Sequence, residues 1–290
     1  MTHLILTIAA LGLACASCAT SQAGAAAGDV APAESESRLP VVRTPEKADP
    51  PSRSPATSPK GSSKPAVVVE LFSSEGCSSC PPADALLREI AATPRDDADV
   101  IALEMHVDYW NDLGWADPYS SPSFTERQRS YAEALGDGRI YTPQMVVDGA
   151  AGFVGSQRGT ARAAIARAAA SPKARVTISR SGSPEVLRVQ VSDVPAPKPR
   201  AEVLLAFVED GLSSDVTRGE NAGSTLAHAP VVRALKRLDT MASGAPSVDI
   251  EVPETPLLQS AWRRSHLRAV ALVQSAETRA ILGAAWVSMD

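Results

Sequence analysis

The sequence predicts an α/β fold class, in which a first folded part alternates strands and helices and a second part is rich in β-strands. Short β-branched apolar runs at residues 67–72 and 100–105 are typical of buried strands, and residues 83–91 between them have helical apolar spacing. After residue 172, runs of alternating polarity are separated by turn residues. This second pattern predicts antiparallel sheet arranged as a small sandwich.

Length, composition and charge allow one or two domains and exclude one class of partner. The chain has 290 residues, of which 44% are hydrophobic, and a formal net charge of −5. This acidic net charge gives no sign of the basic surface patch that binds nucleic acid. We expect four segments: an export signal over 1–25, a disordered Ala/Ser/Pro-rich linker over 26–65, an α/β domain over 66–171 and a β-rich domain over 172–290.

Residues 4–16 are apolar or small and predict a secretory signal. The stretch is shorter than the roughly 20 residues that a membrane-spanning helix needs. Cleavage is expected near Ala23-Gly24-Ala25, or else Cys15 or Cys18 becomes a lipid-modified first residue. The protein is therefore expected to be exported and periplasmic or associated with the cell envelope, with a lipid tether as one option. An apolar N-terminus without a targeting role is the competing interpretation.

The expected elements follow one another as β-α-β-α-β-β-α and then as a series of strands. Strands are expected at 67–72, 100–105, 141–149 and 151–154, and helices at 83–91, 123–135 and 159–170. Ser121 or Ser123 is the expected N-cap of the second helix, and the first crossover should make the first two strands parallel. Further strands are expected at 175–179, 186–191, 201–209, 247–252, 266–274 and 281–287, and 231–238 is ambiguous between strand and helix.

Cys77-Ser78-Ser79-Cys80 directly follows the first strand and directly precedes a helix. A strand, a C-x-x-C loop and a helix in this order are thioredoxin-like. A thiolate at a helix start is stabilised by unpaired N–H groups and the helix dipole, and the short spacer lets the second cysteine resolve a mixed disulfide. Cys77 is therefore the predicted catalytic nucleophile and Cys80 the resolving thiol. The serine hydroxyls offer hydrogen bonds to the Cys77 sulfur.

Prolines bear on this site in two places. Because a residue before proline avoids the α region, Pro81 and Pro82 predict that the helix begins about one turn later than it would without them. In a thioredoxin-like fold, a cis proline faces the C-x-x-C loop and exposes the preceding backbone to an extended substrate. The place of Thr142 and Pro143 in the order of elements predicts a cis bond and a substrate-binding role there.

Polar and aromatic residues gather after the second strand, at the sheet edge where ligands bind in open α/β sheets. His106, Asp108, Tyr109 and Trp110 are the candidate wall of the site, with Asp108 or His106 assisting proton transfer. The alternative is that the aromatic side chains pack the loop and the polar groups bond to backbone.

Two further polar features have a simple and a functional interpretation. Glu104 lies at the end of an apolar strand, so exposure to solvent is the simpler interpretation. As a buried carboxylate with a raised pKa, it would instead accept the proton of the resolving thiol. The turn at residues 218–221, Arg-Gly-Glu-Asn, either docks the second domain against the cysteine loop or is a solvated surface loop.

Three groups of residues form long motifs: ELFSSEGCSSCPPAD at 70–84; HVDYW at 106–110 with GW at 114–115, DP at 117–118 and YTPQ at 141–144; and RGENAG at 218–223 with Leu226, His228 and VVR at 231–233. They resemble the DUF1223 family of bacterial exported proteins from about residue 66 to the C-terminus. The resemblance implies a thioredoxin-like first part with a β-rich extension. The biochemical role of the family is not established, so the predicted function depends on the residues themselves.

The predicted function is an exported thiol-disulfide oxidoreductase that exchanges disulfides with protein or small-molecule thiols and with a redox partner protein. One alternative is a copper or zinc binding or delivery protein that uses the same thiols with His106 or His228, although neither histidine has a short ligand spacing to the cysteines. Another is a binding module in which the cysteines form a structural disulfide. No cofactor is expected and no metal ligand is assigned. No motif specifies the substrate or the direction of exchange.

Overall fold

The computed structural model describes residues 64–180, 186–254 and 258–290. This part of the chain contains three α-helices, an eight-stranded mixed sheet, and antiparallel sheets of three and two strands, so the predicted α/β class is confirmed. The expected export signal and nearly all of the expected linker lie outside the described residues. None of the described helices is both long and apolar enough to cross a membrane.

The helices and strands lie close to the ranges predicted from apolar periodicity. The helices are α1 (Pro81–Ala92), α2 (Pro122–Leu135) and α3 (Arg158–Ala169). The strands are β1 (Ala66–Ser73), β2 (Asp99–His106), β3 (Gln144–Val147), β4 (Ala151–Val154), β5 (Arg175–Arg180), β6 (Val186–Ser192), β7 (Ala201–Glu209), β8 (Ser213–Asp215), β9 (Thr225–Ala227), β10 (Val231–Met241), β11 (Ser247–Pro253), β12 (Leu267–Ser275) and β13 (Ile281–Ser288). The ambiguous segment at 231–238 is therefore a strand.

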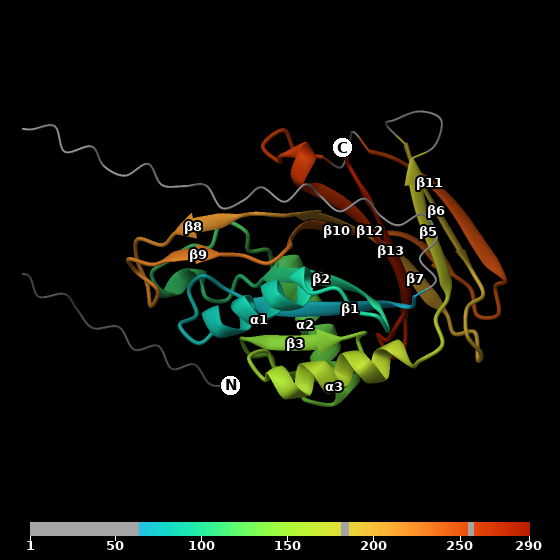
Figure 1. Cartoon of the computed structure of the whole chain (residues 1–290), viewed down its shortest axis with the longest axis horizontal. Helices are drawn as coiled ribbons and strands as arrows, with labels where there is room; N and C mark the ends of the chain where they lie inside the picture. Colours follow the sequence, from blue (N-terminus) through green and yellow to red (C-terminus); the bar gives the residue numbers. More distant parts are fainter. Residues whose placement is uncertain (1–63, 181–185, 255–257) are drawn as a thin grey trace, which may run out of the picture. The chain divides into compact units, whose positions relative to one another are not determined.

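The large sheet has the order β13-β12-β7-β10-β2-β1-β3-β4 (Figure 1). β1 and β2 are parallel, as the crossover through α1 predicts, and β3 is antiparallel to β1. β10 joins the free edge of β2 in parallel, at the pair Val231 and Glu104. Strands from both sides of residue 171 thus share one sheet. The division into two domains at that residue stays a prediction.

Alternate residues of β1 face opposite layers, as the two-residue period of a strand requires. Val67, Val69 and Leu71 pack into a cluster with buried residues of α1 and α3. Val68 and Phe72 pack on the opposite face with buried residues of α2. The sheet is therefore covered by helices on both faces in this region, which accounts for the continuous apolar run of β1.

The C-terminal strands form a second layered region. Val203, Leu205 and Phe207 on β7 pack against Leu187 and Val189 on β6. β6 is the central strand of the three-stranded sheet, whose order is β11-β6-β5. The predicted antiparallel sandwich is thus present as a small sheet stacked on the β7–β12 part of the large sheet, rather than as two separate sheets of its own.

Capping residues in the sequence correctly predict the ends of α2, whereas the prolines lead to a wrong prediction for the start of α1. Ser121 caps α2 by accepting a hydrogen bond from the Ser123 N–H, and Gly136 ends it with φ of 77°. The predicted one-turn delay of α1 is wrong, because α1 begins at Pro81 and Cys80 has helical φ and ψ of −79° and −38°. The Cys80 carbonyl accepts hydrogen bonds from two N–H groups of the first turn, which offsets the bias against the α region before proline.

A buried ion pair ties α2 to the sheet. Glu70 on β1 is fully buried, and its Oε1 accepts from Arg127 Nε at 2.6 Å. Arg127 also donates to the Gln274 side chain on β12 at 3.0 Å and to the Tyr131 hydroxyl at 2.8 Å. The Tyr131 hydroxyl in turn donates to Glu70. This network compensates a charge that would otherwise be unpaired inside the protein.

Substitution of Arg127 should therefore be costly. We expect Arg127→Met to lower the free energy of unfolding by about 3–5 kcal/mol, because Glu70 is left as an uncompensated buried charge. Arg129→Met on the same helix removes an exposed pair with Glu126 and should change it by less than about 0.5 kcal/mol. Urea denaturation of both variants with the disulfide intact tests this, and equal effects would contradict it.

Candidate functional site

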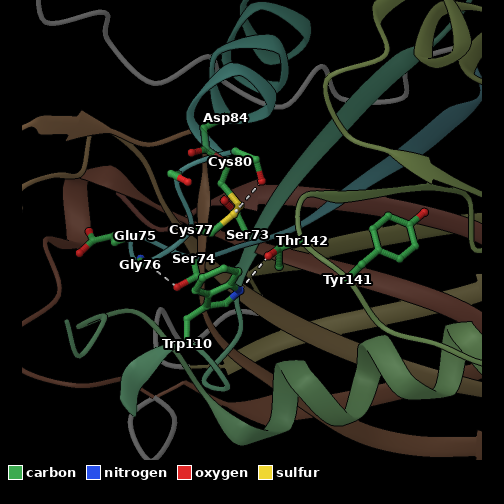
Figure 2. The surroundings of a disulfide bond; sticks show 12 residues. Ser73, Ser74, Glu75, Gly76, Cys77, Cys80, Asp84, Trp110, Tyr141 and Thr142 are labelled. Carbon is green, nitrogen blue, oxygen red and sulfur yellow. Dashed lines mark hydrogen bonds between the residues drawn. A yellow bond between two sulfur atoms is a disulfide. The ribbon is translucent and has the colours of Figure 1, made fainter. Parts of the chain in front are cut away.

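Cys77 and Cys80 form a disulfide, with Cα atoms 5.4 Å apart, in the loop between β1 and α1 (Figure 2). Both cysteines are fully buried, whereas Ser78 and Ser79 between them are exposed. The Ser79 hydroxyl lies 3.3 Å from the Cys77 sulfur, so a serine hydroxyl contacts the sulfur as expected. The disulfide lies at the N-terminus of α1, where the helix dipole favours negative charge.

Trp110 and Thr142 lie beside the disulfide (Figure 2). The Thr142–Pro143 bond is cis, as predicted. Trp110 Nε1 donates to the Thr142 hydroxyl at 2.8 Å, and the Trp110 Cβ would be only 3.2 Å from a Cβ placed on Gly76. Trp110 thus packs between the cysteine loop and the segment that enters β3.

The other residues of the predicted wall face elsewhere. The Tyr109 hydroxyl donates to Gln128 on α2 at 3.3 Å, and Asp108 accepts a hydrogen bond from Thr125 on the same helix. His106 is fully buried and points into a cluster of ionisable side chains. Of the four wall residues, Trp110 therefore contacts the cysteine loop directly. The roles predicted for the others stay predictions.

The turn between β8 and β9, residues 216–224, covers the cysteine loop. Asn221 Nδ2 donates to the carbonyl of Glu75 at 2.8 Å and to that of Cys77 at 3.0 Å. The Ser78 N–H donates to Glu220 Oε2 at 3.0 Å. The turn thus contacts the cysteine loop, as the docked interpretation predicts, although Glu220 is also exposed to solvent, as the solvated-loop interpretation predicts.

Five ionisable side chains form a buried cluster behind the cysteine loop. Glu104 Oε1 lies 3.2 Å from His106 Nε2 and 3.3 Å from His228 Nδ1. The other ring nitrogens bond to two further carboxylates, His106 Nδ1 to Asp117 at 2.7 Å and His228 Nε2 to Glu75 at 2.9 Å. All five residues expose 5% of their surface or less.

Both interpretations of Glu104 are corrected by this cluster. The side chain is fully buried instead of exposed. Burial raises the pKa of Glu104, but hydrogen bonds and charge from His106 and His228 outweigh it and lower the pKa to about 2. A carboxylate with this pKa is a poor proton acceptor, so Glu104 is unsuited to deprotonate the resolving thiol.

The two histidines are affected in the opposite direction. Burial lowers the pKa of His228, but its bonds to Glu104 and Glu75 dominate and raise the pKa to about 9. The pKa of His106 is likewise raised well above its usual value, because Asp117 and Glu104 outweigh burial. Carboxylates therefore control the charge of this cluster.

Asp84 is the titratable group on α1 next to the disulfide (Figure 2). It lies one turn after Cys80 in the helix, is 5% exposed, and accepts a hydrogen bond of 2.6 Å from the Ser73 hydroxyl. Burial, followed by the charge of Glu104, raises the pKa of Asp84 to about 7. A carboxyl group with this pKa can both take up and release a proton near neutral pH.

Sequence reasoning missed Asp84 and Asn221. Asp84 follows Cys80 by four residues, so helical spacing placed both on the same face of α1 and could have identified it. Asn221 is 144 residues from Cys77, and no pattern in the sequence links the two. Asp117 and Glu75 were likewise hidden, because their histidine partners come from other elements.

Comparisons with known proteins place the chain in a family. The sequence model described as "Protein of unknown function (DUF1223)" matches residues 68–274, and the chain belongs to this family, as its motifs predict. The fold is similar to that of protein AGR_C_4864 from Agrobacterium tumefaciens, with 28% identity and a TM-score of 0.61 over 77% of this chain and 94% of that chain. It is also similar to HBP35 of Porphyromonas gingivalis, with 15% identity and a TM-score of 0.53 over 79% and 76% of the two chains, a likeness in fold alone. No curated protein matches the sequence.

The contacts of Asn221 predict how easily the disulfide is reached. Asn221→Ala removes two hydrogen bonds to the cysteine loop, which together are worth about 1–2 kcal/mol. We expect dithiothreitol to reduce the disulfide about 5- to 30-fold faster in this variant, measured by alkylation and mass spectrometry. Ser224→Ala in the same turn keeps both bonds and is the control. An unchanged rate in the Asn221 variant would show that the turn does not limit access.

The raised pKa of Asp84 predicts that this residue lowers the stability of the folded protein by an amount that depends on pH. The folded protein holds the Asp84 proton up to about pH 7, whereas the unfolded chain releases it near its ordinary value of 3.8. The contribution of Asp84 to the stability of the wild type therefore falls between these values and then levels off. The free energy of unfolding of Asp84→Asn relative to that of the wild type should therefore increase by at least about 1.4 kcal/mol from pH 4 to pH 8. Urea denaturation across this range tests it, with the exposed Asp112→Asn as control, and parallel curves for wild type and Asp84→Asn would refute it.

Proposed function

We propose that this member of the DUF1223 family is an exported, thioredoxin-like thiol-disulfide oxidoreductase, with Cys77 as nucleophile and Cys80 as resolving thiol. One observation carries the proposal: the two cysteines are joined as a disulfide at the N-terminus of α1, beside a carboxyl group, Asp84, whose pKa is about 7. A disulfide that serves only to staple a loop has no need of a proton donor and acceptor beside it.

The exchange proceeds in two balanced steps. A substrate thiolate attacks the Cys77 sulfur, a new intermolecular S–S bond forms, and the Cys77–Cys80 bond breaks with its electron pair on Cys80. A second substrate thiolate then attacks the mixed disulfide and releases Cys77 as a thiolate. The substrate leaves oxidised and the pair is reduced by two electrons. Run in reverse, the same steps reduce a substrate disulfide.

Asp84 supplies the proton balance on the Cys80 side. When Cys80 leaves as a thiolate, neutral Asp84 can give it a proton, and in the reverse direction the carboxylate can take that proton back. Ser73 holds the carboxyl group through its hydroxyl at 2.6 Å, which fixes the orientation of the acid. Cys77 receives its stabilisation from the helix terminus and the Ser79 hydroxyl.

Substrate access requires movement around the disulfide, and we assign this movement to the turn at 216–224. Both cysteines are fully buried, and Asn221 and Glu220 tie the turn to the backbone of the cysteine loop. We assign the backbone of Thr142 and Pro143 to the binding of the substrate chain, with Trp110 as the apolar wall.

The proposal includes the compartment and the partners. The apolar segment at residues 4–16 supports export to the periplasm or cell envelope, where a disulfide persists, and Cys15 or Cys18 offers a site for a lipid tether. The partners are proteins or small molecules that carry thiols or disulfides, together with a redox partner protein that resets the pair. Fractionation of cells that express the full chain tests the location.

Trapping through Cys77 tests the chemistry. In Cys80→Ser the mixed disulfide has no resolving thiol, so we expect disulfide-linked adducts with protein substrates to accumulate on non-reducing gels. The Cys77→Ser/Cys80→Ser variant retains Cys15 and Cys18 and is the matched control. Adducts in both variants would point to the N-terminal cysteines instead of the proposed nucleophile.

The reduction potential of the pair decides between exchange and a structural role. We expect a reversible transition between roughly −120 and −270 mV in thiol buffers, the range of catalytic pairs, with its value indicating the direction. A pair that stays oxidised below about −300 mV, together with an absence of adducts in Cys80→Ser, would identify a structural disulfide and end the proposal.

A further inference from the structure

We propose that Glu104, His106 and His228 bind a divalent first-row transition metal ion behind the cysteine loop, through Glu104 Oε1, His106 Nε2 and His228 Nδ1. This site is separate from the thiol chemistry proposed above and uses neither cysteine. The three donor atoms all lie within 4.8 Å of one another, and the three side chains are buried. Two imidazoles and one carboxylate form a donor set that proteins use for Zn²⁺ and Fe²⁺.

Two of the three separations between donor atoms match those around a metal ion, and the third, between the two ring nitrogens, lies within 4.8 Å. For bonds of about 2.0–2.1 Å in a tetrahedral Zn²⁺ site, neighbouring donor atoms lie about 3.3 Å apart. Glu104 Oε1 is 3.2 Å from His106 Nε2 and 3.3 Å from His228 Nδ1. An ion held by these three atoms has at least one further coordination position, the arrangement of sites that also bind an exogenous ligand.

The outer contacts fix the orientation of each ligand, and the ion displaces the proton from the nitrogen that binds it. A metal-binding histidine usually donates its other ring N–H to a carboxylate, which sets the tautomer and the ring orientation. His106 Nδ1 bonds to Asp117 at 2.7 Å and His228 Nε2 bonds to Glu75 at 2.9 Å, so the remaining nitrogens of both rings point toward Glu104. The second oxygen of Glu104 accepts the Ala229 N–H, which leaves Oε1 for the ion.

One atom of the cluster lacks a satisfactory partner. Among the described residues, His106 Nε2 is a buried side-chain nitrogen without a well-aligned hydrogen bond. Glu104 Oε1 lies 3.2 Å away, close enough for the electrostatic attraction that lowers the pKa of Glu104, but it is not aligned with the ring nitrogen. A buried nitrogen that is held by Asp117 and directed away from a hydrogen bond is unusual, because buried polar atoms are generally paired. A metal ion between His106 and Glu104 satisfies it.

Charge is compatible with an ion in the cluster but does not by itself favour one. Glu75, Glu104 and Asp117 place three carboxylates around two imidazoles in a pocket with almost no exposure. Two protonated imidazoles bring two positive charges to these three carboxylates. A divalent ion displaces one proton from each ring and supplies the same positive charge, while the outer carboxylates keep their bonds to the imidazoles.

The ion would connect segments that are far apart in the sequence. Glu104 and His106 end β2, whereas His228 lies between β9 and β10. His228 also holds Glu75, two residues before Cys77, so the ion would stabilise the segment that carries the cysteine loop. The sequence alone does not indicate this ligand set, because His228 lies more than 120 residues after Glu104 and His106.

Metal binding by the full chain without a polyhistidine tag tests the proposal. The measurements are metal content by inductively coupled plasma mass spectrometry, and titration with Zn²⁺ or anaerobic Fe²⁺ in the presence of a competing chelator. We expect a single tightly bound ion per chain, lost in His228→Gln and retained in His266→Gln, which removes an imidazole outside the cluster. Asp117→Asn should weaken binding about 10- to 100-fold, since Asp117 orients His106.

The cysteine variant separates this site from a thiol site. Cys77→Ser/Cys80→Ser should keep the ion, and its loss there would overturn the proposal in favour of metal binding by the thiols. Wild type that binds neither ion, or binding that survives His228→Gln, would overturn it as well. If His228→Gln does not fold, Co²⁺ added to wild type decides: a spectrum of nitrogen and oxygen ligands supports the site, and thiolate-to-cobalt charge transfer refutes it.

Discussion

The contacts of Glu104 with residues 228–231 hold the first β-α-β unit and the later strands of the large sheet together. The Glu104 N–H donates to the Pro230 carbonyl at 2.8 Å, and its carboxylate accepts from the Ala229 N–H and contacts His228. Val231 then pairs with Glu104 as β10 enters the sheet beside β2. A single buried acidic residue thus fixes where the later strands join the first β-α-β unit. Its charge is tolerated because two imidazoles and a backbone N–H compensate it.

The same contacts between Glu104 and His228 determine the surroundings of the disulfide. His228 ends the hairpin formed by β8 and β9, whose turn places Asn221 and Glu220 on the cysteine loop. His228 also bonds to Glu75, which lies within that loop. The environment of Cys77 is therefore assembled from both halves of the chain. A fragment that ends near residue 171 would expose the cysteines and change both their reactivity and the charge around Asp84.

Patterns local in sequence predicted most of the fold. Two-residue alternation and helical spacing identified the strands and helices, and C-x-x-C with the later Thr142–Pro143 located the disulfide and the cis bond. Patterns of this kind cannot reveal that a buried charge is paired with a residue far away in the sequence. Glu104 looked exposed because a carboxylate in an apolar strand is costly unless paired, and its partner His228 is 124 residues away. The start of α1 was mispredicted for a related reason. A residue before proline usually avoids the helical conformation, but Cys80 adopts it because its carbonyl accepts hydrogen bonds that form only in the folded loop.

Access to the disulfide and the state of the buried cluster are linked through His228. The turn at 216–224 connects β8 to β9, and His228 directly follows β9, so a movement of the turn away from the cysteine loop would act on His228. A His228 held tightly by Glu104 and Glu75 restricts that movement, whereas a loosened one permits it. Occupation of the cluster by a metal ion would therefore favour the covered disulfide. On this argument, thiol exchange at Cys77 and metal binding at Glu104 oppose each other, even though they share no ligand.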